Sequence, residues 1–101
     1  MGACDFWTTA NGSDAKAAFR QAREDALYEN GHGGYSGTIA EKPSFKKLSV
    51  PAGVDPTEFA RRVSADAQDG RDPHGYLNKW GPALCVQVTD SEYLFFGIAS
   101  S

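Results

Sequence analysis

A chain of 101 residues that is 41% hydrophobic and 12% aromatic has room for one domain with one core, which we assign to residues 1–101. Its net charge of -3 gives no overall attraction for a nucleic-acid polymer, although a local group of Arg or Lys can still bind a small anion. No apolar segment approaches the roughly 20 residues needed to span a bilayer, and the first residues do not have the pattern of a secretion signal. The sequence therefore predicts a cytoplasmic protein that is not bound to a membrane. Its two cysteines, Cys4 and Cys85, are expected to be buried free thiols.

The first part of the chain predicts a strand followed by a helix. The stretch "CDFWTT" (4–9) is rich in aromatic and β-branched residues, as strands are. From Asp14 to about Asn30, small apolar residues recur at helical spacing, with Ser13 or Asp14 as the cap. Gly31 is suited to ending this helix.

The middle of the chain predicts two extended pieces and a second helix. The pieces are "YSGTIA" (35–40) and "SFKKLSVP" (44–51), and the irregular alternation of the second favours a bulge or an edge position. In the next segment Asp55 is an N-cap, Pro56 fits the first helical position and Glu58 completes a capping box. This helix is expected to run to about Gln68.

A long polar loop, "DGRDPHGYLNKWGP" (69–82), leads into a hairpin formed by "ALCVQV" (83–88) and "EYLFFGIA" (92–99). The last run hardly alternates, which predicts a central strand covered on both faces. The fold class is therefore α+β: a mixed or mostly antiparallel sheet with two helices packed on it, in the order β-α-β-β-α-β-β.

The glycine-rich stretch "ENGHGGYSGTIAEK" (29–42) has two interpretations. It is either a helix terminator with a tight strand entry, or a loop whose amides bind an anion. Phosphate loops normally precede a helix, whereas this one follows a helix and lacks GxxxxGK[ST], so a nucleotide-hydrolysing P-loop is excluded. The candidate ligand-binding residues in this first loop are His32, Gly33, Gly34, Tyr35, Ser36, Thr38 and Lys42.

The long polar loop repeats the order His, Gly, Tyr and supplies the candidate residues His74, Tyr76 and Trp80. If the two loops met, the histidines and tyrosines of both would line one pocket, with Trp80 able to stack on a ligand. Side chains that could bind an anion are Arg20, Arg23, Lys46, Lys47, Arg61, Arg62, Arg71 and Lys79, most of which are expected to be ordinary solvated surface.

Two kinds of site are disfavoured by spacing. The two histidines and two cysteines are too far apart for a structural zinc site, and no cofactor is indicated. There is no GxSxG elbow for a Ser-His-Asp hydrolase, although His32 could still be the base of a small hydrolase.

The strings "ALYENGHGGYSGTIAEK" and "KWGPALCVQV…EYLFFGIASS" resemble a group of small uncharacterised proteins of bacteriophages and mobile elements. The resemblance implies a phage accessory protein acting in the cytoplasm of a host cell. It favours a non-enzymatic binder that sequesters a small anionic ligand, such as a nucleotide immune signal, as a counter-defence protein and as a homo-oligomer. The alternatives are an inhibitor that masks a host protein and a small hydrolase with His32 as base.

Overall fold

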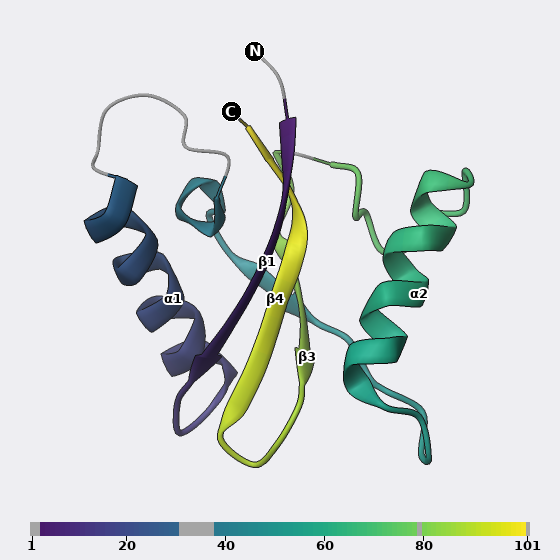
Figure 1. Ribbon diagram of the computed structural model, residues 1–101, viewed down its shortest axis with the longest axis horizontal. Helices are drawn as coiled ribbons and strands as arrows, with labels where there is room; N and C mark the ends of the chain where they lie inside the picture. The colour runs from purple at the N-terminus through teal and green to yellow at the C-terminus, as the bar shows by residue number, and fades with distance from the viewer. Residues whose placement is uncertain (1–2, 31–37, 79, 101) are drawn as a thin grey trace.

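The computed structural model describes residues 3–30, 38–78 and 80–100, which form one mixed sheet with a helix on each face (Figure 1). Its elements are β1 (Ala3–Asn11), α1 (Ala15–Asn30), the 3-10 turn η1 (Ile39–Glu41), β2 (Phe45–Lys47), α2 (Pro56–Gln68), β3 (Ala83–Gln87) and β4 (Glu92–Ser100). The strand order is β1-β4-β3-β2. β4 is antiparallel to both neighbours, whereas β2 is parallel to β3. The expected α+β class and mixed sheet are confirmed.

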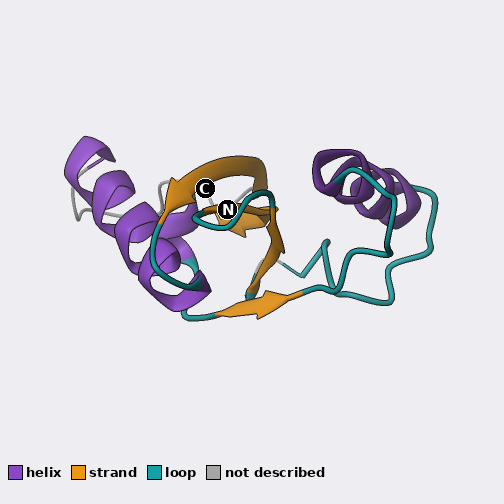
Figure 2. Ribbon diagram, turned by 90° about the horizontal axis from the view of Figure 1, so that it is seen from below, coloured by secondary structure: helices purple, strands orange, loops and turns teal. Residues whose placement is uncertain are grey.

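The two helices lie on opposite sides of the sheet (Figure 2). A separate hydrophobic core lies under each of them. The first core lies under α1 and includes Phe6, Phe19 and Phe95. The second lies under α2 and includes Val63, Leu84 and Phe96. Because side chains of a strand alternate between faces, one strand such as β4 supplies both cores.

The prediction of a central, doubly covered last strand is confirmed by β4. It lies between β1 and β3, and Tyr93 to Phe96 are all buried. An apolar strand of this kind can also indicate an interface between copies of a chain. The structure gives a simpler reason, since both faces of this strand are already covered within one chain.

The junction between β1 and α1 depends on one cap and one glycine. Asp14 Oδ1 accepts a hydrogen bond from the Ala17 amide at 2.8 Å, so Asp14 caps the helix. A Cβ on Gly12 would lie 2.5 Å from the backbone nitrogen of Ala18, too close for any larger residue without a shift. The small side chains Ala18 and Ala22 are buried, which lets the helix approach the sheet closely.

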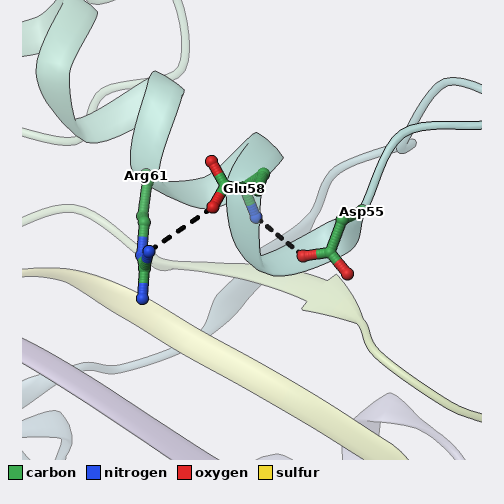
Figure 3. A network of polar contacts seen from close by, with 3 residues as sticks. All are labelled: Asp55, Glu58 and Arg61. Carbon is green, nitrogen blue, oxygen red and sulfur yellow. Dashed lines mark hydrogen bonds and ion pairs between the residues drawn. The ribbon is translucent and has the colours of Figure 1, made fainter.

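The start of α2 confirms the predicted N-cap (Figure 3). Asp55 Oδ2 accepts a hydrogen bond from the Glu58 amide at 3.0 Å, and Pro56 is the first helical residue. The Glu58 side chain does not complete the box but forms an exposed ion pair with Arg61 at 3.4 Å. Half of the capping box is therefore present.

One predicted strand is wrong in the described part. In place of the end of the expected extended piece 35–40, Ile39–Glu41 form η1, and its N-cap Thr38 accepts a hydrogen bond at Oγ1 from the Ala40 amide at 3.2 Å. A hydroxyl cap that close favours a turn over an extended chain. Residues 35–37 lie outside the described part. The second piece contributes only the short strand β2, and its predicted edge position is confirmed.

The two thiols differ in exposure. Cys85 is buried in β3 as expected, and burial raises its pKa to about 12. Cys4 is exposed, so the expectation that it is buried is wrong; it lies on β1, which in the described sheet has a neighbouring strand on one side only. Both thiols are free. Across the described ranges, no helix is both long and apolar enough to cross a membrane.

Candidate functional site

Most of the first predicted loop lies outside the described residues, namely His32, Gly33, Gly34, Tyr35 and Ser36. Their proposed role in binding an anion stays a prediction. Of the same loop, Thr38 and Lys42 are described, and both have structural roles. Thr38 is the N-cap of η1.

Lys42 is a buried lysine that ties the end of the first loop to the end of the second. Only 1% of its surface is exposed. Its Nζ donates to the carbonyl oxygens of Asn78 at 3.2 Å and Gly81 at 3.1 Å, and lies 5.8 Å from the centre of the Phe6 ring. Burial lowers the pKa of this ammonium. The Lys42 ammonium therefore holds the ends of the two loops together, and its burial keeps it from contact with a phosphate in solution.

Tyr76 lies on the opposite face, in the core beneath α2. Its ring is buried and its centre lies 6.2 Å from that of Phe96. Burial raises the pKa of its hydroxyl, and the neighbouring Asp5 carboxylate acts in the same direction, while a hydrogen bond with Ser64 opposes them. This hydroxyl joins β1 to α2, and its proposed role in ligand binding stays a prediction.

His74 and Trp80 lie apart from these two residues. His74 lines a small cavity of about 120 Å³ between α2 and the loop that follows it; the other lining residues are Phe59, Arg62, Val63, Asp66, Arg71 and Pro73. Trp80 is 62% exposed, and its amide donates to Asn78 Oδ1 at 3.1 Å. Among the described candidates, the structure therefore brings Lys42 to Asn78 and Gly81 but leaves His74 and Tyr76 on the other side of the sheet.

A larger hollow lies beside β3, away from the two loops that hold the predicted ligand-binding residues. This groove has a volume of about 650 Å³ and is bordered by two segments, 47–50 and 87–90. Its lining residues are Lys47, Leu48, Ser49, Val50, Gln87, Val88, Thr89 and Asp90. We call it the β3 groove.

The β3 groove begins where the parallel strands stop pairing. The last backbone bond between the two segments, among the described residues, runs from the Leu48 amide to the Cys85 carbonyl at 2.8 Å. Beyond it the segments that continue β2 and β3 border an open space. In open α/β sheets, ligands bind outside the carboxyl ends of the parallel strands, and the β3 groove has the same position relative to the parallel pair β2 and β3.

The backbone of Gln87 faces this space. The Val88 amide donates to the Glu92 carbonyl at 2.8 Å, so Val88 faces β4. Because backbone groups alternate along a strand, the N–H and C=O of Gln87 point the other way, toward the groove. No other described backbone group bonds them. A ligand could supply the missing partner for the N–H, a strong donor.

The side chains give the β3 groove a cationic end and polar walls. The Lys47 ammonium donates to Gln87 Oε1 at 3.2 Å and lies 5.9 Å from the centre of the Tyr93 ring. The hydroxyl residues Ser49 and Thr89 stand on opposite segments. Asp90 also borders the groove, and its carboxylate repels a negatively charged group. The negative charge of a ligand is therefore favoured at the other end of the groove, near Lys47.

Lys47 was among the possible anion-binding side chains in the sequence, whereas the role of Gln87 and the hydroxyls had no sequence signal. The Gln87 amide can face a ligand only because the segments that continue β2 and β3 separate, and these strands are far apart in the sequence. In the described part of the chain, no cluster of three His, Cys, Asp or Glu side chains could hold a metal ion.

Comparison with known proteins adds no relative: no family model, curated protein or solved structure matches this chain.

Proposed function

We propose that this chain is a non-enzymatic binding protein that sequesters a small anionic ligand in the β3 groove. The observation that carries the proposal is that the Gln87 N–H, which has no backbone partner among the described residues, lies with the Lys47 ammonium at the edge of one open space. An N–H and a lysine ammonium together are a common arrangement for holding a phosphate or carboxylate. The apolar walls Leu48, Val50 and Val88 would take the uncharged part of the ligand.

The size of the groove supports a ligand as large as a nucleotide. Its volume of about 650 Å³ falls within the range of about 300–1,000 Å³ common for small-molecule sites. The cavity of about 120 Å³ near His74 is below that range. Together with the resemblance to phage proteins, the size leads us to propose a nucleotide signal of a host cell as the ligand, bound without a cofactor.

The test is a thermal-shift titration with inorganic phosphate, AMP, ATP and a cyclic dinucleotide. A true ligand should raise the melting temperature in a saturable way, with a stabilisation of about 2.7 kcal/mol when its concentration reaches 100 times Kd. Lys47→Met should lose most of this shift. Lys46→Met is the matched control, since Lys46 is an exposed lysine on the opposite face of the same strand.

Three results would count against the proposal. One is the absence of a shift with all four anions at millimolar concentration. Another is a shift of the same size in Lys47→Met and in the wild type, which would place the binding elsewhere on the chain. A shift lost equally in both lysine variants would point to non-specific charge attraction and would also count against the groove.

A further inference from the structure

The outer edge of the sheet is a long strand with one side unpaired. β1 runs for nine residues and has β4 as its only neighbour in the described sheet. The Gly12 amide donates to the Ser91 carbonyl at 2.9 Å, in register with the β1–β4 ladder. Backbone groups therefore face β4 at even positions, and those of Asp5, Trp7 and Thr9 point outward.

These outward groups have no backbone partner among the described residues. Natural sheets usually protect such an edge with Lys, Pro or a bulge. Residues 3–11 contain no Lys, Arg or Pro, they pair with β4 without a bulge, and Asp5 is their only charged residue. Trp7 is 44% exposed at the middle of this edge, with its ring centre 5.4 Å from that of Phe96. The edge thus has donors, acceptors and an aromatic side chain ready for another strand.

We propose that a second copy of this chain pairs with this edge, β1 against β1 and antiparallel, with the two-fold axis at Trp7. Each outward-facing residue then meets an outward-facing residue of the other copy. Trp7 faces Trp7, and Asp5 faces Thr9, whose hydroxyl can donate to the carboxylate.

Symmetry and charge select this register. The outward positions 3, 5, 7, 9 and 11 are distributed evenly about Trp7, so all nine residues of each strand overlap only when the axis lies there. An axis at Asp5 would set two carboxylates directly opposite each other, which is destabilising. With the axis at Trp7 the two Asp5 residues are four positions apart along the strand, at about 13 Å.

The pairing would join two four-stranded sheets into one continuous sheet. The β3 groove lies beside β2, at the far edge from β1, so dimer formation leaves both grooves open. The inference is therefore independent of the proposed function, and either can fail without the other.

A cysteine pair tests the register directly. On the α1 face, the axis at Trp7 sets Cys4 of one copy opposite Ala10 of the other, as a pair with Cα atoms about 4.5 Å apart. Disulfides form at Cα separations of about 4.4–6.8 Å. Within one chain the two positions are about 20 Å apart along the strand, so a bond between them can only join two copies.

We expect Ala10→Cys to form a disulfide-linked dimer on mild oxidation. The dimer band should be seen on a gel run without reductant and should return to monomer when reductant is added. Two controls should stay monomeric on the same gel: Cys4→Ser with Ala10→Cys, and Asn11→Cys, which puts the thiol on the opposite face. Cross-linking in the first control, or none in Ala10→Cys, would overturn the register.

Light scattering tests the dimer without a new cysteine. The wild type should show twice the chain mass of 10.9 kDa at 100 µM. Thr9→Pro removes an outward N–H without touching the bonds to β4, so it should be a folded monomer. Thr9→Lys adds an edge charge and should give the same result if the proline variant folds poorly. A monomeric wild type, or a dimer that persists in the folded variants, would overturn the proposal. A monomeric wild type would indicate that the free edge of β1 pairs instead with an extended segment of another protein.

Discussion

Replacing Lys42 by Met isolates the effect of its ammonium, because methionine is also long and flexible and fills similar space. Lys42 is 1% exposed, and its Nζ donates to the carbonyls of Asn78 and Gly81. The methionine thioether cannot donate, so both carbonyls lose a charged partner.

The expected loss is large for a single residue. A hydrogen bond to a charged group is worth about 1.5–3 kcal/mol. Two such bonds are partly offset by the cost of burying the ammonium, which is also why burial lowers the Lys42 pKa. We therefore expect Lys42→Met to lower the free energy of unfolding by about 2–3 kcal/mol. At about 4–8 °C per kcal/mol for a domain of this size, the melting temperature should fall by about 10–20 °C.

Urea titration followed by far-ultraviolet circular dichroism measures this difference. Lys46→Met serves as the control, since its exposed side chain should change stability by no more than about 0.5 kcal/mol. A Lys42→Met variant within about 0.5 kcal/mol of the wild type would show that the two carbonyls are satisfied by water, and the structural role assigned to this lysine would be refuted.

Two further predictions concern the α2 cap and the buried thiol. Asp55→Ala should destabilise the protein by about 1 kcal/mol in urea titrations because the Glu58 amide loses its acceptor. Glu58→Gln should cost less than about 0.5 kcal/mol because the ion pair of Glu58 with Arg61 is exposed. Equal losses in the two variants would contradict the role of Asp55 as the N-cap. The raised pKa of Cys85, about 12 in the folded chain against an ordinary value of 9.0, gives stability that is complete below pH 9 and is lost as the pH rises toward 12. Between pH 9 and 11 the wild type should therefore lose about 1.4 kcal/mol per pH unit more than Cys85→Ala, and parallel stability curves would show that the thiol does not titrate as proposed.

Local signals in the sequence were sufficient for the helices and for the centre of the sheet. Asp55 and Pro56 specify the start of α2 through contacts within one turn, so the chain around them needs no tertiary information. The unbroken apolar run in β4 indicates burial on both faces and hence a central place. Each of these signals lies within a few residues of the structure it predicts.

The candidate site depended on contacts that no local pattern records. A lysine in a polar loop is normally solvated, yet Lys42 is buried because carbonyls 36 and 39 positions later lie beside it. The β3 groove likewise exists because β2 pairs in parallel with β3 for three residues and then separates from it. Parallel pairing between strands distant in sequence cannot be inferred from the few residues of β2.

The pairing of β1 with β4 has a consequence for the order in which the chain acquires its structure. Ala3 pairs with Ser100 and Asn11 with Glu92, whereas β3 and β4 are joined by a short turn. Closing a long loop costs conformational entropy before any contact repays it, so the β3–β4 hairpin should form early and β1 should dock late. During synthesis, β1 leaves the ribosome long before its partner strand exists, and for that interval its aromatic segment must be kept from other nascent chains.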